Sequence, residues 1–454
     1  MILRISIFFI GLLFMTSSLK ANDARILDIQ SVKTPAGITV WHIEDHTLPI
    51  ITMNFAFKGA GAVTDPANHI GLGQIVSNTL DEGAGERTGH EFQTALQDHA
   101  IDLSFGNGRD HFTGKIKTLT KHKNLTEELL RDALMAPRFD DEAITRMKNA
   151  NLMRLKSSLA STDWLAARLM NDVYFGGHTY ARNSGGTLSG IASITKEAME
   201  NFTQNYLTRD RLFVSVAGDM TQDEAADFVD KIFSNLPSGS PQNSVDNVSP
   251  PTAPVKKAFK TESPQSSVQM VWPIFPKTDP DYYALRVLNH LLGAGGFSSA
   301  LMEEVREKRG LTYGIYSRPI HMNFSNYMSI ESATSPENIA PMMAAITDVL
   351  NEFKTEHVSD DKLTAARNYL VGSLPLRFST TQSLSRTAMS MGLNDMGIDY
   401  LDLWDDEILK VTAADVKRVA ERIFISTTPT AMVIAGAVPD DLGFEIIETM
   451  PGVE

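Results

Sequence analysis

The residues that come nearest to a metal site by type and spacing lie in the segment His42-Ile43-Glu44-Asp45-His46. Imidazole and carboxylate groups are zinc ligands, and positions 42, 44 and 46 of a strand share one face. The segment ends a predicted strand just before a turn, where solvated polar residues are expected. We therefore expect His42, Glu44 and His46 to be ordinary strand-end residues, with a metal site as the alternative.

Other patterns exclude whole classes of chemistry. The chain has no cysteine, which excludes disulfides, thiol nucleophiles and cysteine-ligated metals. The glycine-rich segment 293–296 lacks the following Lys-Ser/Thr of a phosphate-binding loop, and no Gly-x-Ser-x-Gly motif is present. A net charge of −14 without a basic run gives no electrostatic footprint for nucleic acid.

Residues 1–21 have the pattern of a secretory signal peptide. Arg4 precedes an apolar run from Ile5 to Met15, and a small polar stretch ends at Ala21. The run of about eleven residues is too short to cross a bilayer core of roughly 30 Å as a helix. We predict cleavage, a periplasmic location and no membrane attachment of the mature chain, with a retained anchor as the alternative. Loss of Arg4 and Lys20 changes the net charge from −14 to −16.

The remaining chain is predicted to consist of two halves joined by a linker. Residues 237–254, PSGSPQNSVDNVSPPTAP, are rich in proline and serine and contain no aromatic residue. We predict an N-terminal domain over 22–236, a linker over 237–256 and a C-terminal domain over 257–454.

Patterns of the first half recur in the second half 217–220 positions later. The helix start at 194–198 recurs at 411–415, and the strand LFVSVAG that ends at Gly218 recurs as AMVIAG that ends at Gly436. Such offsets are typical of duplicated domains with small insertions. Chance similarity between helix-strand units is the alternative.

Each half mixes strands with runs of helices, which predicts an α+β fold. In the first half, GITVWHIE and PIITMNFAFKG read as antiparallel strands and 211–217 as a further strand, with helices near 71–82, 90–100, 125–135, 141–160, 163–173, 195–206 and 221–235. In the second half, strands are expected near 267–273 and 311–317, with helices near 279–292, 298–308, 337–354, 360–371, 382–394 and 412–424.

Several of these segments resemble the pitrilysin/insulinase-like zinc peptidases. They are DHTLPIITMNFAFKGAGAVTDPANHIGLGQIVSNTLDEGAG in the first half, and LLGAGGFSSAL followed by EEVREKRGLTYGIYS in the second half. The resemblance covers nearly the whole mature chain. It implies two homologous α/β sandwich domains, joined by the linker, that pair into a clam-shell around an unfolded peptide.

The resemblance also implies where zinc would bind, and there the sequence departs from the family. Active members carry His-x-x-Glu-His on the helix before the turn that holds Gly83. The matching positions are Gln74, Ser77 and Asn78. Amides and hydroxyls do not compete with imidazole for zinc, and the family's third ligand, a glutamate on a later helix, has no counterpart between Glu142 and Glu197. We expect no zinc in this chain.

A second family element is present. The resemblance implies that Arg309 and Tyr313 reach the substrate, where a guanidinium donates to carbonyls and a phenol stabilises an oxyanion. It also places a glycine loop, Gly293, Gly295 and Gly296, near the substrate cavity. The alternatives are that Arg309 caps a helix C-terminus, that Tyr313 packs in a strand and that the loop is a flexible helix connection.

An absent zinc motif beside a retained Arg/Tyr pair is typical of one subunit of two-chain members. The sequence therefore predicts a chain that is inactive alone and forms a heterodimer with a zinc-bearing homologue, completing the chamber for unfolded peptides. One alternative is a homologue that only binds peptides or serves as a scaffold. Another is an active zinc peptidase with relocated ligands.

Overall fold

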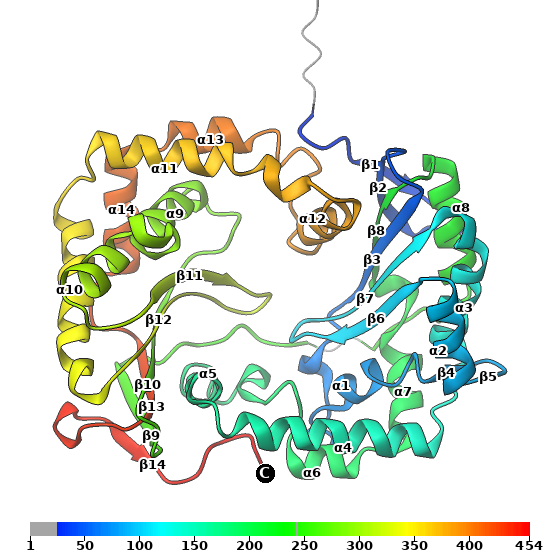
Figure 1. The fold of residues 1–454 in the computed structure, drawn as a ribbon, viewed down its shortest axis with the longest axis horizontal. Helices are drawn as coiled ribbons and strands as arrows, with labels where there is room; N and C mark the ends of the chain where they lie inside the picture. The colour runs from blue at the N-terminus through cyan, green and yellow to red at the C-terminus, as the bar shows by residue number, and fades with distance from the viewer. Residues whose placement is uncertain (1–24, 242–243) are drawn as a thin grey trace, which may run out of the picture.

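The computed structural model describes residues 25–241 and 244–454, so the predicted signal peptide lies outside the described residues. Figure 1 shows two halves, each built on a twisted sheet with helices on its outer side. Within the described ranges, no helix combines the length and the apolar character that a membrane span requires. The α+β fold predicted from the sequence is confirmed.

A six-stranded sheet organises the first half, in the order β1-β2-β8-β3-β7-β6. β8 pairs parallel with β2 and antiparallel with β3. The two strands predicted at the start of this half are therefore antiparallel to each other, but they are not neighbours. The strands are β1 (Gln30–Lys33), β2 (Thr39–Glu44), β3 (Ile50–Lys58), β6 (Asp102–Asn107), β7 (His111–Leu119) and β8 (Leu212–Gly218), with a separate small pair β4 (Gly83–Ala84) and β5 (Arg87–Thr88).

Helices cover the outer face of this sheet because they carry apolar residues at helical spacing. In α8, for example, a capping box at Thr221 and Glu224 starts the helix, and Phe228, Val229 and Ile232 are fully buried in the core of this half. The helices are α1 (Leu72–Ser77), α2 (Gly89–Asp98), α3 (Lys123–Met135), α4 (Asp141–Ser158), α5 (Thr162–Tyr174), α6 (Leu188–Ser193), α7 (Lys196–Tyr206) and α8 (Gln222–Phe233).

The second half repeats this architecture. Its sheet has the order β11-β12-β10-β13-β9-β14, in which β9, β13, β10, β12 and β11 occupy the places of β2, β8, β3, β7 and β6. The repeat read from the sequence is thereby confirmed, and only the edge strands differ, since β1 pairs antiparallel and β14 pairs parallel. The strands are β9 (Val255–Lys260), β10 (Ser266–Pro273), β11 (Ile315–His321), β12 (Asn326–Thr334), β13 (Ala431–Gly436) and β14 (Glu445–Ile447).

Most helices of the second half lie close to their predicted bounds, but the helix Trp404–Lys410 was not predicted. The predicted helix 298–308 is a 3-10 turn followed by a π-helical segment (Met302–Lys308), and the strand predicted at 311–317 begins only at Ile315. β9 begins at Val255, inside the predicted linker 237–256. The helices are α9 (Tyr282–Asn289), α10 (Ile339–Thr355), α11 (Asp360–Gly372), α12 (Thr381–Leu393), α13 (Trp404–Lys410) and α14 (Ala413–Ile423).

The two halves exchange one helix each. α12 of the second half packs on β3 and β8 of the first, and α5 of the first half packs on β13, β10 and β9 of the second (Figure 1). At the α12 contact, the Ser385 hydroxyl is fully buried, accepts from Asn54 Nδ2 at 2.8 Å and donates to the Ser215 carbonyl at 3.0 Å. This reciprocal packing fixes the position of each half relative to the other.

Candidate functional site

The short helix α1 carries the three positions that match the family's zinc motif. Its N-terminus is held by the buried Asp65 carboxyl group, which accepts from the backbone amides of Gly71 at 2.8 Å and Gly73 at 3.0 Å. Burial raises the pKa of Asp65 to about 7. The helix ends at Ser77 rather than near 82 because the chain turns there toward Gly83, whose φ of +115° leads into β4.

The structure brings Gln74, Ser77 and Asn78 together, and they bond to one another. Gln74 Nε2 donates to Asn78 Oδ1 at 3.0 Å, and the Ser77 hydroxyl donates to the Gln74 carbonyl at 2.8 Å. These neutral groups do not fit a zinc ion, because none supplies the imidazole or the carboxylate that zinc requires. The local polar groups instead satisfy each other.

Beyond its first turn, which holds Asp141 and Glu142, the neighbouring helix α4 carries no carboxylate that could replace the missing third ligand. Its buried polar residue is Asn151, whose Nδ2 donates to the Met147 carbonyl at 2.8 Å. Across the described residues, no group of three or more His, Asp and Glu side chains is arranged to hold a metal ion.

The residues of the segment His42-Ile43-Glu44-Asp45-His46 lie in different environments. His46 lies beyond the end of β2 and is exposed, where Nδ1 contacts Asp219 at 2.7 Å and Nε2 contacts Glu44 at 2.8 Å. His42 is fully buried, and burial lowers its pKa. The expectation of solvated residues is therefore correct for Glu44 and His46 and wrong for His42, because β2 lies inside the sheet and contacts both α8 and α12.

Arg309 stands at the C-terminal end of the π-helical segment, as the helix-capping alternative describes. Its Nη2 lies 3.1 Å from Asp348 Oδ2 on α10 and 4.0 Å from Glu304 Oε2. The side chains of Arg309 and Asp348 are 39% and 63% exposed. An ion pair this exposed contributes roughly 0–1 kcal/mol, so Arg309 can leave it at low cost.

Tyr313 lies in the turn before β11 and does not pack in a strand. Its side chain is 85% exposed, at a groove of about 870 Å³ that is also lined by Arg306, Glu307 and Thr334. Arg306 Nε donates to the Tyr313 carbonyl at 3.1 Å, which anchors the turn. The Tyr313 ring is therefore exposed at the groove.

The glycine loop reaches the same neighbourhood. A Cβ on Gly293 would lie 2.5 Å from the Ser317 amide nitrogen, so this glycine allows close packing on β11. A Cβ on Gly295 would lie 2.8 Å from the His290 carbonyl oxygen, and Gly296 has a φ of +62°. The following Phe297 ring lies 4.6 Å from the Arg306 guanidinium carbon. Arg306 thus links the loop to the Tyr313 turn.

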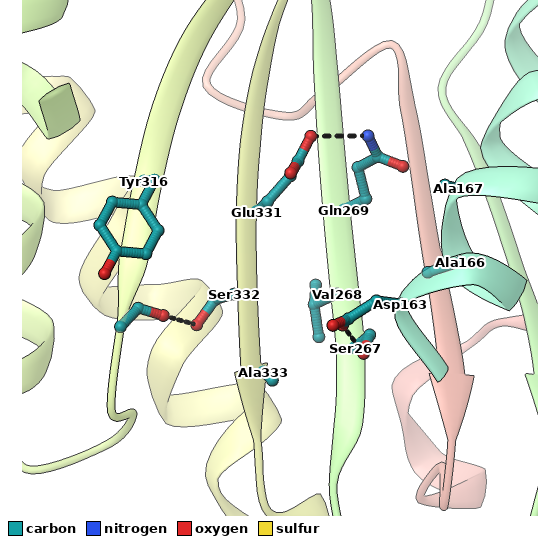
Figure 2. A pocket seen from close by; sticks show the side chains of 11 residues that line it. Asp163, Ala166, Ala167, Ser267, Val268, Gln269, Tyr316, Glu331, Ser332 and Ala333 are labelled. Carbon is teal, nitrogen blue, oxygen red and sulfur yellow. Dashed lines mark hydrogen bonds between the residues drawn. The ribbon is translucent and has the colours of Figure 1, made fainter. Parts of the chain in front are cut away.

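A further pocket, of about 350 Å³, lies between α5 and the second sheet (Figure 2). Two pairs of its polar residues are hydrogen-bonded: Ser267 Oγ donates to Asp163, and Gln269 Nε2 donates to Glu331 Oε1 at 3.0 Å. Sequence reasoning missed this pocket because β12, which carries Glu331, was not predicted. The alternating polar residues of NYMSIESAT were the available signal.

Comparison with known proteins identifies relatives of the whole chain. Residues 193–370 match the family model described as "Peptidase M16 inactive domain". The chain is 24% identical to "Non-peptidase homolog YmxG" of Helicobacter pylori, over 88% of this chain and 91% of that protein. It is 22% identical to "Uncharacterized zinc protease YmxG" of Bacillus subtilis, over 83% and 91%.

A more distant relative is "Mitochondrial-processing peptidase subunit beta" of Dictyostelium discoideum, 20% identical over 91% of this chain and 87% of that protein. Among solved structures, the crystal structure of a peptidase M16 inactive domain from Pseudomonas fluorescens has the same fold. It superposes with a TM-score of 0.85 at 24% identity and covers 91% of this chain and 98% of that one.

Proposed function

We propose that this chain, a homologue of zinc-protease-like M16 proteins as its resemblance to the pitrilysin/insulinase type predicted, is the zinc-free and inactive subunit of a two-chain peptidase. In this proposal it works in the periplasm, pairs with a zinc-bearing homologue and completes the chamber that receives unfolded peptides. The zinc ion belongs to the partner.

The proposal rests on a contrast between two elements. In α1 the polar side chains at the zinc-motif positions bond to one another, whereas the turn before β11 exposes the Tyr313 ring. Gln74, Ser77 and Asn78 satisfy one another. Tyr313 instead presents a free ring at a groove. A homologue that kept neither element would not need the Tyr313 turn, in which Arg306 Nε donates to the Tyr313 carbonyl.

The names of two relatives each agree with one part of the proposal. "Non-peptidase homolog" describes a relative without the activity, and "subunit beta" describes a relative that works in an assembly. The periplasmic location rests on the signal-peptide pattern of residues 1–21 alone.

In the assembled enzyme, Tyr313 and Arg309 would act on the peptide backbone. The Tyr313 hydroxyl donates to a substrate carbonyl oxygen and stabilises the negative charge that develops there. Arg309, released from its exposed pair with Asp348, donates to a neighbouring carbonyl with its fork of N–H groups.

The test is peptide hydrolysis by the complex reconstituted with the zinc-bearing homologue of the same host. Loss of one oxyanion donor lowers kcat by about 10²–10³-fold, so we expect Tyr313→Phe to show a loss of this order and Arg309→Ala a loss of at least tenfold. Arg131→Ala and Tyr369→Phe are matched controls, because Arg131 is similarly exposed and Tyr369 stacks on His290 through its ring. Both controls should retain full activity.

The peptide-binding or scaffold alternative makes the opposite prediction. It is favoured by the pairing of Arg309 with Asp348, which points this side chain toward α10 rather than toward Tyr313. Unchanged hydrolysis in both Arg309→Ala and Tyr313→Phe would contradict the catalytic contribution and establish the alternative.

A further inference from the structure

A second-half pocket of about 610 Å³ is lined by residues of α9, α12 and the start of α13, and it has an unusual charge. Four cationic side chains line it: Lys277 from the loop before α9, Arg286 from α9, Arg377 from the 3-10 turn Pro375–Phe378 and Arg386 from α12. Among the described residues that line it, none is acidic.

These four cations are not neutralised by the rest of the chain. Within the described residues, none has a carboxylate oxygen within the 4.0 Å of an ion pair. The contrast with nearby arginines is direct: Arg418 and Arg422 on α14 bond to Asp281 and Asp279 beside α9. In a protein with 55 acidic and 41 basic residues, four unpaired cations at one pocket are not explained by composition.

Two of the four cations are only partly exposed, and an unpaired charge is costly there. Lys277 is half-buried and donates to Asn394 Oδ1 at 2.7 Å. Arg286 is half-buried, with its guanidinium carbon 5.7 Å from the Trp404 ring centre, and its buried Nε has no hydrogen-bond partner within the described chain. Burying like charges without a counter-ion raises the free energy of the folded protein. Binding of an anionic ligand would lower it.

Neighbouring groups respond to this positive potential. Burial lowers the pKa of Lys277, and the Arg286 charge lowers it further. The pKa of His321 falls to about 4, chiefly through burial, with Lys277 and Arg286 adding to the effect. In both cases burial is the larger cause, and the neighbouring cations add to it.

The mouth and walls of the pocket fit a peptide. Arg377 and Arg386 are exposed at the rim, together with the hydroxyls of Ser379, Thr380 and Ser390. The walls are apolar and aromatic, formed by Leu376, Phe378, Met391, Tyr400 and Trp404. A site for a bare inorganic anion needs no such walls, whereas an acidic side chain carried on an extended peptide uses both the cations and the apolar surface.

We propose that this pocket binds acidic side chains of a peptide, with Lys277 and Arg286 receiving the carboxylate and Arg377 and Arg386 attracting it at the rim. The proposal rests on the proposed function in taking the ligand to be a peptide. It deepens that function by predicting a local preference for acidic segments, although the net charge of the whole chain is negative.

The experiment measures binding to the mature chain without any partner subunit. The fluorescence anisotropy of a labelled nine-residue peptide with three glutamates is compared with that of the same peptide with three glutamines. Charge-assisted hydrogen bonds to a carboxylate are the difference between them, so we expect at least about tenfold tighter binding of the glutamate peptide. The difference should shrink at high salt, because the rim charges are exposed.

Two sets of variants locate the binding. Arg377→Gln/Arg386→Gln changes exposed residues only and should weaken glutamate-peptide binding about tenfold, while Lys277→Met/Arg286→Gln should abolish the preference over the glutamine peptide. Arg131→Gln, an exposed arginine on α3, is the matched control and should bind as the wild type does. The circular dichroism spectrum of each variant confirms that it is folded.

Equal affinity for the two peptides, or glutamate-peptide binding unchanged in Arg377→Gln/Arg386→Gln, would overturn the proposal. Binding of inorganic phosphate to the mature chain, with no binding of the glutamate peptide, would likewise overturn the assignment to peptides. Because no partner subunit is present, a failure here leaves the two-chain proposal standing, and a failure to form the complex leaves these titrations valid.

Discussion

Gln74 and Asn78 occupy one face of α1, one turn apart, where imidazoles would bind zinc in an active relative. In this chain, the amide of the first donates to the amide oxygen of the second at 3.0 Å, and Ser77 bonds to the helix backbone. The helix therefore keeps the geometry of the motif without its donor chemistry. Three substitutions at these positions would still leave the third ligand missing on α4.

His46 gives a residue-scale prediction about pH. Its hydrogen bond to Asp219, and then that to Glu44, raise its pKa above 6.5 in the folded protein. A raised pKa means that the interaction stabilises the fold fully below pH 6.5 and is lost as the pH rises through the folded value. The NMR titration of His46 should therefore show a pKa above 6.5.

The Asp219→Asn variant tests the cause of that shift. It should lower the titration midpoint of His46, because the first and largest contribution is removed. Asp227→Asn removes an exposed carboxylate from α8 and should leave the midpoint where it is. A His46 titration that does not respond to Asp219→Asn would contradict the assignment.

At the scale of elements, local periodicity predicted the helices well and the sheet poorly. α4, α5, α8 and α14 lie within a few residues of their predicted bounds, because their capping residues and apolar spacing are local signals. β8 lies between β2 and β3 although more than 150 residues separate it from either, and no local pattern reports such a pairing.

The difference between local and long-range signals also explains why the zinc-motif positions were predicted and the cationic pocket was not. The zinc-motif positions were found because Gln74, Ser77 and Asn78 follow one spacing on one helix. The cationic pocket was not found, because Lys277, Arg286, Arg377 and Arg386 come from four elements that only packing brings together. Each of these residues alone reads as an ordinary surface charge.

The packing of α12 on the first sheet depends on Gly392. A Cβ at this position would lie 2.0 Å from the Phe213 ring on β8, so Gly392→Ala must displace the helix or the ring. Overpacking of this kind costs about 1–3 kcal/mol, which should lower the midpoint of urea unfolding. Gly372→Ala on α11 is the control, since within the described chain nothing lies within 4 Å of that Cβ.

Both substitutions gain the same helix propensity, of about 1 kcal/mol, so the difference between their midpoints isolates the contact between α12 and β8. Gly392→Ala should also increase cleavage by added protease at the segment around 375–380, because α12 is the helix by which the second half packs on the first sheet. Equal unfolding midpoints for the two variants would show that α12 does not depend on this close approach.

At the scale of the whole molecule, the two sheets share one strand order and the halves exchange one helix each. The exchange makes the two halves one unit, so a partner meets both together. The exposed Tyr313 turn and the unpaired cations of the pocket at α9 and α12 both belong to the second half, while the zinc-motif positions belong to the first. This asymmetry is what the proposal of a zinc-free subunit requires.

The most direct test of that proposal is to purify the tagged mature chain from its own host and to determine the mass and zinc content of whatever co-elutes in equal amount. We expect a homologue of similar size that carries zinc, and a tagged chain that holds none after separation. A tagged chain that elutes alone or with itself, or one that alone cleaves peptides in a chelator-sensitive way, would contradict it.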